Sequence, residues 1–252
     1  MKVKLDLHVH SDGSEDGRHS ISTLAEAAAS AGISAIAVCD HNRCTSLPEN
    51  SDVLLIPGTE VSTNMGHILG LFLTRPLDYE KLRRDGLPTG SAAVREIHAC
   101  GGIAVLAHPF ERADARAGAD AEALERLSEC GLDLIETANS RAPMKVRDAN
   151  QKAAALALRM GLGAVGGSDA HSAEELGNCY TVVEVDELTV GSIQAALRTQ
   201  RCEAVFVREC SWKRKALSQW AKARRSGKLK TIIKALVYLA VSPFRDLLKG
   251  KS

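Results

Sequence analysis

Two histidines, His8 and His10, stand two positions apart at the end of the short apolar run over residues 5–11. In a β-strand the side chains at positions i and i+2 leave the same face, so we expect both imidazoles to point at one spot. Such a pair can chelate a metal ion. A lone His-x-His pair also occurs at exposed strand ends, so the prediction of a metal site depends on ligands elsewhere in the chain.

Four further polar segments each follow directly after a run of Ile, Val, Leu or Ala. They cover residues 39–42, 58–61, 107–109 and 167–171, and they carry His41, Glu60, His108, Asp169 and His171. A continuous apolar run is typical of a strand buried in a parallel sheet, so each segment is expected at the carboxyl end of a strand. In a parallel β/α barrel those ends form one rim, where active sites lie.

The remaining sequence supports a barrel of this kind. At 252 residues and 45% hydrophobic composition, the chain is long enough for one large α/β domain. Apolar runs predict seven strands with helical segments between them, which is the order of a (β/α)7 barrel. Two more strand-like runs, over residues 180–185 and 203–207, flank a predicted helix and form an appendage. We therefore expect one domain over residues 1–207.

The segment over residues 208–252 differs sharply from this body in charge. The body holds 19 Lys and Arg against 29 Asp and Glu, a net −10, whereas the C-terminal segment holds 13 against 2, a net +11. An acidic body suits a site that collects cations. A basic segment suits a polyanion such as nucleic acid, or a membrane surface.

Apolar residues repeat at helical spacing from Leu229 to Ala240 within this basic tail, and lysines take the other faces. The pattern predicts an amphipathic basic helix that ends at Pro243. Its apolar face can dock on the body or on a second copy in a homo-oligomer, or it can contact a membrane surface. Polyanion binding by the lysines is a further alternative.

The seven cysteines are scattered and never spaced Cys-x-x-Cys, which is typical of reduced, mostly buried thiols. No signal-like segment precedes the first predicted strand, and no stretch of about 20 apolar residues could span a bilayer. These features predict a cytoplasmic protein.

Over roughly residues 3–207 the ordered motifs resemble those of the PHP (polymerase and histidinol phosphatase) superfamily, and in particular its stand-alone metal-dependent phosphoesterases. The motifs are DLHVHS at 6–11, DHN at 40–42, GTE at 58–60, HILGL at 67–71, AHP at 107–109, ETAN at 136–139 and GSDAH at 167–171. The resemblance implies a distorted seven-stranded barrel that holds two or three divalent metal ions.

Carried over position by position, the resemblance also implies three groups of ligands. His8, His10, Glu60 and Asp169 would hold one ion, Glu60 would bridge to a second ion held by His67 and His108, and a third would be held by His41, His171 and an acid of the first loop. The loop acid is Asp16 or Glu15, because relatives differ in its spacing, and we favour Asp16.

Mixed imidazole and carboxylate ligands suit Zn, Mn or Fe, and a carboxylate can bridge two such ions. Adjacent ions acidify a shared water and neutralise phosphate oxygens. This predicts that a metal-activated water hydrolyses a phosphate ester of a small metabolite, a nucleotide or a short oligonucleotide, without a Ser or Cys nucleophile. Arg43, Asn139 and Arg141 lie just past predicted strand ends and are candidate substrate contacts, although a solvated loop is the alternative for each.

Two other functions fit parts of the pattern. Amidohydrolases also begin with His-x-His, but their sites commonly use a carboxylated Lys, and none of the body lysines follows a predicted barrel strand directly, whereas Glu60 does. A non-catalytic barrel that serves as a scaffold in a nucleoprotein complex would use the basic tail as its contact, yet relatives of that kind tend to have lost ligands. We expect the tail to be an accessory for location or assembly, not for turnover.

Overall fold

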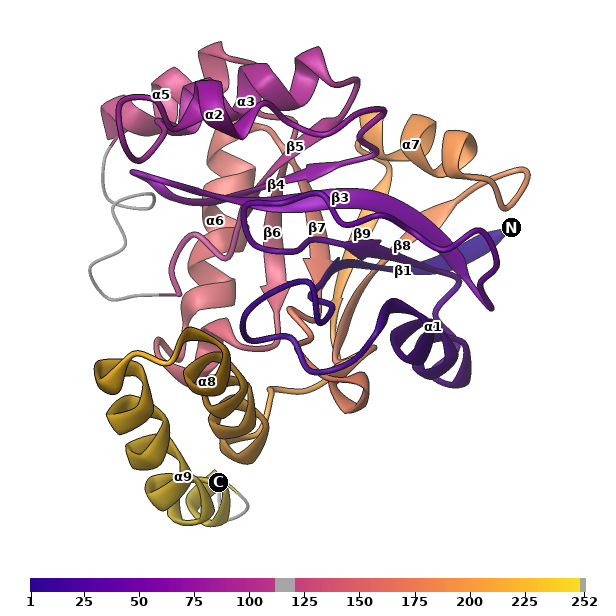
Figure 1. Ribbon diagram of the computed structural model, residues 1–252. Coiled ribbons are helices and arrows are strands. Elements are labelled where there is room, and N and C mark those ends of the chain that lie inside the picture. The colour runs from indigo at the N-terminus through magenta and orange to yellow at the C-terminus, as the bar shows by residue number, and fades with distance from the viewer. Residues whose placement is uncertain (112–120, 250–252) are drawn as a thin grey trace.

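A single mixed sheet organises the chain in the computed structural model, which describes residues 1–111 and 121–249 (Figure 1). Its strands are β1 (Lys2–Val9), β2 (Ala35–Val38), β3 (Leu54–Thr63), β4 (Gly66–Leu71), β5 (Ile103–Ala107), β6 (Leu134–Asn139), β7 (Gly163–Gly167), β8 (Cys179–Glu184) and β9 (Cys202–Phe206). They are ordered β7-β6-β5-β4-β3-β2-β1-β8-β9 among the described residues. The predicted appendage is thus β8, α7 (Val190–Arg198) and β9, paired antiparallel at the β1 edge.

The sheet curls until β1 and β7 lie close together, which nearly closes the barrel. The His10 amide, just after β1, donates to the Ala170 carbonyl at 2.8 Å, and the Ser168 amide, just after β7, donates to the carboxylate of Asp6 in β1 at 2.8 Å. The α/β barrel predicted from the sequence is therefore confirmed.

Helices cover the outside of the barrel (Figure 1). They are α1 (Ile21–Ser30), α2 (Tyr79–Leu82), α3 (Gly90–Ala99), α5 (Ala121–Glu129) and α6 (Ala149–Met160), with short 3-10 turns at Ala142–Met144 and Ala173–Glu175. Side-chain caps define the N-termini of α1 and α3, because the Ser20 side chain accepts from the Thr23 amide and the Thr89 side chain accepts from the Ala92 amide. One apolar core fills the barrel, and a second lies between β4–β6 and the helices α3, α5 and α6.

The strand β4 differs from the prediction of a wholly parallel barrel. It pairs antiparallel with both β3 and β5. The reason is the connection, because only Asn64 and Met65 separate β3 from β4, and two residues permit a hairpin but no crossover helix. The reversal brings the start of β4 to the rim where the parallel strands end, with His67 opposite Ser62.

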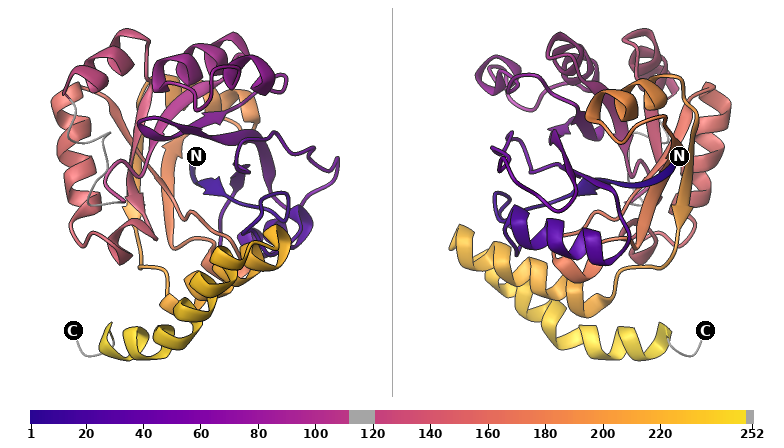
Figure 2. Two further views of the ribbon diagram at one scale, coloured as in Figure 1. Left: turned by 60° about the vertical axis from the view of Figure 1, so that its left-hand side comes forward. Right: turned by 90° about the vertical axis from the view of Figure 1, so that its right-hand side faces the viewer.

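The C-terminal segment forms two helices, α8 (Trp212–Ser226) and α9 (Leu229–Lys249), that pack against each other. Gly227 turns the chain between them with a left-handed φ of 63°. Both views of Figure 2 place this pair beside the N-terminal segment at one end of the barrel. The boundary between residues 207 and 208 stays a prediction, and residues 250–252 of the predicted tail lie outside the described residues.

The predicted end of the amphipathic helix at Pro243 is wrong, because α9 continues through this residue to Lys249. Proline has no amide hydrogen to donate to the carbonyl four residues earlier. The Ser242 hydroxyl donates to that carbonyl of Leu239 at 3.2 Å and replaces the missing bond. Across the described part of the chain, no helix has both the length and the apolar character needed to cross a bilayer.

Candidate metal centre

The structure brings all nine predicted metal ligands to one rim of the barrel. His8 lies in β1, Glu60 in β3 and His67 in β4, while the loops after β1, β2, β5 and β7 carry His10 and Asp16, His41, His108, and Asp169 and His171. Five of the nine side chains are at most 7% exposed, and the other four, Asp16, Asp169, His41 and His67, reach no more than 24%.

Glu60 is the centre of this group, with a side chain that is 1% exposed. Its carboxylate oxygens lie 2.6 Å from His67 Nδ1, 2.7 Å from His41 Nδ1, 3.0 Å from His108 Nε2, 3.4 Å from His10 Nε2 and 3.6 Å from His8 Nε2. One carboxylate in contact with five imidazoles is an arrangement suited to bridging two cations.

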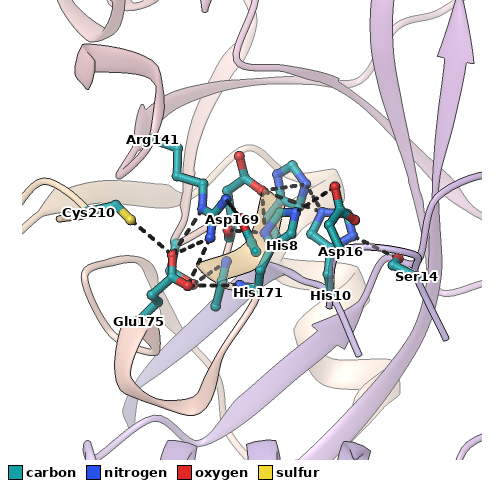
Figure 3. A network of polar contacts seen from close by, with 12 residues as sticks. His8, His10, Ser14, Asp16, Arg141, Asp169, His171, Glu175 and Cys210 are labelled. Atoms are coloured by element: carbon teal, nitrogen blue, oxygen red, sulfur yellow. Dashed lines mark hydrogen bonds and ion pairs between the residues drawn. The ribbon is translucent and has the colours of Figure 1, made fainter. Parts of the chain in front are cut away.

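Two further carboxylates complete the cluster (Figure 3). Asp169 Oδ1 lies 3.4 Å from both His10 Nε2 and His171 Nδ1. Asp16 lies 3.6 Å from His41 Nε2 and 3.6 Å from His171 Nε2. Glu15, the alternative loop acid, has a side chain that is 59% exposed and contacts Lys222 instead.

Several backbone positions at the rim are held in the left-handed region that non-glycine residues rarely adopt. The φ angles are 26° at His108, 54° at Asp169 and 53° at Asn42. Such conformations persist only where surrounding contacts impose them, and they cluster at functional sites. At His108 the contact is a hydrogen bond from its amide to Glu136 Oε2 at 2.9 Å.

Glu136 is a site residue that the sequence motifs included but to which no role was assigned. Its Oε1 lies 3.0 Å from His8 Nδ1, and its Oε2 also accepts from the side-chain Nδ2 of Asn139. The signal in the sequence is an acid within the otherwise uncharged run of β6, where it is 1% exposed. A buried carboxylate of this kind fixes the ring orientation of a metal-binding histidine.

Electrostatics in the cluster favour paired charges over isolated ones. Burial opposes ionisation of Glu60, but the surrounding histidines outweigh it and hold the pKa of Glu60 well below its usual value. Burial likewise opposes protonation of His41 and His108, yet the contacting carboxylates raise their pKa values to about 8 and about 9. Burial together with His171 and His41 lowers the pKa of His10 to about 3.

The donor set fits divalent metal ions. Three triads each offer ligand atoms within 4.8 Å of one another, and they are His10–His41–His171, His8–Glu60–His108 and His8–His10–Asp169. Asp16 Oδ1, Glu60 Oε2 and His67 Nδ1 are buried and, although each lies within 3.6 Å of an oppositely charged or imidazole group, none makes a well-oriented hydrogen bond among the described residues. Such atoms are costly unless something binds them, and a cation with oxygen and nitrogen ligands would do so.

A cavity of about 1000 Å³ opens over the cluster. Its floor includes Glu60, His108 and Asp169, and one wall comes from the C-terminal helices through Lys215, Gln219 and Lys222 of α8 and Lys230, Thr231, Lys234 and Tyr238 of α9. Reasoning from sequence missed these residues. Their position argues against the expectation that the tail is only an accessory to location or assembly.

The three predicted substrate contacts have different surroundings. Arg43 lines the cavity, where its Nη1 donates to the Gly13 carbonyl at 3.2 Å. Asn139 is buried and its side chain caps the following turn by accepting from the amides of Arg141 and Ala142. Arg141 is 1% exposed and binds both carboxylate oxygens of Glu175 (Figure 3). Neither Asn139 nor Arg141 lines the cavity, and the contacts that the structure gives them are structural; their role as substrate contacts stays a prediction.

Comparison with known proteins connects this site to a family. Residues 6–85 match the model of the PHP domain, and residues 147–202 match the model of the PHP-associated region. An uncharacterized protein of Methanocaldococcus jannaschii is 33% identical over 194 residues, which cover 75% of this chain and 73% of that protein.

Solved structures share the fold at low sequence identity. A two-domain protein from Bacteroides vulgatus that contains a predicted PHP-like metal-dependent phosphoesterase superposes with a TM-score of 0.59 and 23% identity, over 82% of this chain and 65% of that one. A lesion-specific endonuclease from Pyrococcus furiosus superposes with a TM-score of 0.57 and 18% identity, over 79% of this chain and 56% of that one. The chain thus spans less than two thirds of either protein.

Proposed function

The chain belongs to the PHP superfamily, and from this premise we propose that it is a metal-dependent phosphoesterase that hydrolyses a phosphate ester of a small metabolite, a nucleotide or a short oligonucleotide. The observation that carries the proposal is the contact of Glu60 with five histidines on the floor of an open cavity. A buried group of that composition has no evident purpose in a purely structural core.

Within this proposal the ligands divide into three sets. His8, His10, Glu60 and Asp169 would hold one ion, Glu60 with His67 and His108 a second, and Asp16 with His41 and His171 a third. When bound, zinc, manganese or iron supplies Lewis acidity toward a phosphate oxygen and lowers the pKa of water. The number of ions, two or three, and their identity are part of what is to be measured.

The residues around these ligands would hold them in place. Glu136 orients His8 and holds the strained His108 backbone. Asp40 accepts from the Ser11 amide, from the hydroxyls of Ser11 and Ser14, and from Thr45, which fixes the loop that carries Asp16. Arg43 stands on the cavity wall, where a guanidinium could bind a phosphate oxygen pair.

The test is metal analysis of the purified protein combined with a panel of phosphomonoesters, phosphodiesters and amides. We expect at least two equivalents of metal and hydrolysis of a phosphate ester that His8→Ala reduces by a factor of 100 or more. His98→Ala is the matched control, since His98 lies on α3 and pairs with Asp133 away from the cavity. Hydrolysis of amides alone would identify an amidohydrolase, and a protein without metal or turnover would favour the scaffold.

Nucleotide or oligonucleotide substrates are part of the proposal because one structural relative is a lesion-specific endonuclease. A site lined by lysines also suits a phosphorylated ligand. Homo-oligomer formation, membrane-surface contact through the tail and a cytoplasmic location stay predictions.

A further inference from the structure

The C-terminal helices place four lysines on one wall of the cavity, Lys215 and Lys222 from α8 and Lys230 and Lys234 from α9. No carboxylate of the described residues 208–249 lines the cavity with them. These helices follow the residues that match the family models, so the wall is a feature of this chain's own tail. We call these four lysines and Tyr238 the tail wall.

The inner end of the tail wall carries an excess of positive charge. Lys215 Nζ lies 3.8 Å from Glu111 Oε1, and Lys145 Nζ lies 2.6 Å from the same oxygen. The Lys215 side chain is only 11% exposed, and Glu111 also lies 3.8 Å from His108 Nδ1. Two ammonium groups share one carboxylate at the edge of the metal centre. A positive charge that is partly buried without a full countercharge is costly, and binding of an anion there would remove that cost.

The position of α8 relative to the site is fixed by contacts with the first loop. Arg225 Nη1 donates to the carbonyls of Ser14 and Gly17, each at 2.6 Å. Lys222 Nζ lies 3.6 Å from Asp16 Oδ2. The tail wall is therefore held against the loop that carries a proposed metal ligand.

The outer end of the tail wall combines charge with an aromatic ring. Lys230, Lys234 and Tyr238 occur at intervals of four residues on α9, so they form one stripe along the helix, and all three line the cavity. The Tyr238 ring stacks on Trp212 with centroids 6.2 Å apart, and Lys234 Nζ lies 5.9 Å from the Tyr238 centroid, so a base that stacks on this ring would take the place of the Lys234 ammonium. Lysines that follow a phosphate backbone, next to an aromatic side chain on which a base can stack, are the elements of single-strand recognition.

Resting on the proposed phosphoesterase function, we propose that the tail wall binds a single-stranded oligonucleotide. Lys145 and Lys215 would bind the phosphate next to the metal centre, Lys230 and Lys234 the phosphates that follow, and Tyr238 a base. The substrate is then a nucleic acid strand, not a small phosphorylated metabolite.

The binding test uses the full-length protein as isolated and a fluorescein-labelled phosphorothioate oligothymidylate of about ten nucleotides, because this backbone resists hydrolysis. Fluorescence anisotropy gives the Kd. We expect Lys230→Glu/Lys234→Glu to raise the Kd at least tenfold and to lower the slope of log Kd against log salt by about 0.7 for each lysine. Tyr238→Ala should raise the Kd at least threefold.

The matched control is Arg224→Glu/Lys228→Glu, which makes the same charge change at exposed positions of the tail outside the cavity. We expect less than a twofold change in Kd. If both double variants raise the oligonucleotide Kd equally, the proposal is overturned, because the net charge of the tail and not the tail wall would then attract the oligonucleotide. Loss of binding to phosphatidylserine vesicles with an unchanged oligonucleotide Kd would overturn it in favour of a membrane surface.

Turnover separates this inference from the function on which it rests. In the tail-wall double variant, the ratio of kcat/KM for oligothymidylate to kcat/KM for bis(p-nitrophenyl) phosphate should fall at least tenfold. If the wild-type protein hydrolyses esters, and the Lys230→Glu/Lys234→Glu variant has the same oligonucleotide Kd and the same kcat/KM ratio as wild type, the proposed role of the tail wall is refuted. Oligonucleotide binding that depends on the tail wall, without hydrolysis of any ester, refutes the phosphoesterase and supports the wall.

Discussion

His8 Nδ1 lies 3.0 Å from Glu136 Oε1, and both side chains are at most 1% exposed. A neutral imidazole carries one N–H, so donation from Nδ1 to Glu136 leaves the lone pair on Nε2. That atom lies 3.6 Å from Glu60 and 3.8 Å from Asp169. We infer that Glu136 prepares His8 as a metal ligand, and that its effect is measurable without substrate.

Glu136→Gln tests this relationship. The amide keeps the size of the side chain but can no longer stabilise the ring through a charged hydrogen bond, so we expect metal affinity to fall by about 10–100-fold. Competition with a chromophoric chelator measures it, and circular dichroism confirms that the fold is retained. Glu184→Gln, at an exposed position of β8, is the control. An unchanged affinity in Glu136→Gln would contradict the assigned role.

The first loop offers a matched pair of variants, Asp16→Asn and Glu15→Gln. Asp16 lies 3.6 Å from both His41 and His171, whereas Glu15 is largely exposed. We expect Asp16→Asn to lose or weaken one bound ion and Glu15→Gln to keep wild-type stoichiometry, both measured by elemental analysis after dialysis. The opposite result would make Glu15 the ligand.

Stability should depend on pH differently with and without metal. In the metal-free protein the pKa values of about 8 for His41 and about 9 for His108 exceed the 6.5 of the unfolded chain. Between pH 6.5 and 9 the unfolded state therefore binds fewer protons, so metal-free protein loses stability as pH rises, by about 1.4 kcal/mol for each pKa unit of a fully coupled group.

Bound metal ions take the place of these protons, so metal loading should release protons and make stability less dependent on pH. Thermal unfolding at pH 6.5, 7.5, 8.5 and 9, in chelator and in zinc or manganese, measures both slopes. A Tm of the metal-free protein that stays constant or rises over this range would contradict the prediction.

Most of the residues that we propose as metal ligands could be found from the sequence because they lie in short motifs beside apolar runs. His8 lies in β1, His10 directly after its end, and His108 follows β5 directly. The direction of β4 could not be predicted in the same way, although its two-residue connection at Asn64 and Met65 contained the signal.

The tail wall could not be predicted because its contacts join distant parts of the chain. Lys222 meets Asp16 from the other end of the sequence, and the lysine pattern alone does not say which surface α9 approaches. The ion pair of Arg141 could not be predicted for the same reason, since its partner Glu175 lies 34 residues further along the chain.

The contacts of Arg141 yield the final prediction. Its guanidinium donates to Glu175 at 2.7 Å and to the Ser218 hydroxyl of α8 at 3.2 Å, which ties the tail to the barrel. Arg141→Met leaves the buried carboxylate of Glu175 without its countercharge, so we expect the free energy of unfolding to fall by about 3–5 kcal/mol. Urea denaturation measures it.

Exposed Arg147 provides the control for this variant, and Arg147→Met should change the free energy of unfolding by less than about 0.5 kcal/mol. The double variant Arg141→Met/Glu175→Gln should recover part of the loss, because no unpaired charge then remains buried. A stable Arg141→Met protein with a raised KM would instead return this residue to the substrate site. The ion pair predicts the reverse: the free energy of unfolding falls, and the fraction of Arg141→Met protein that remains folded keeps a KM close to that of wild type.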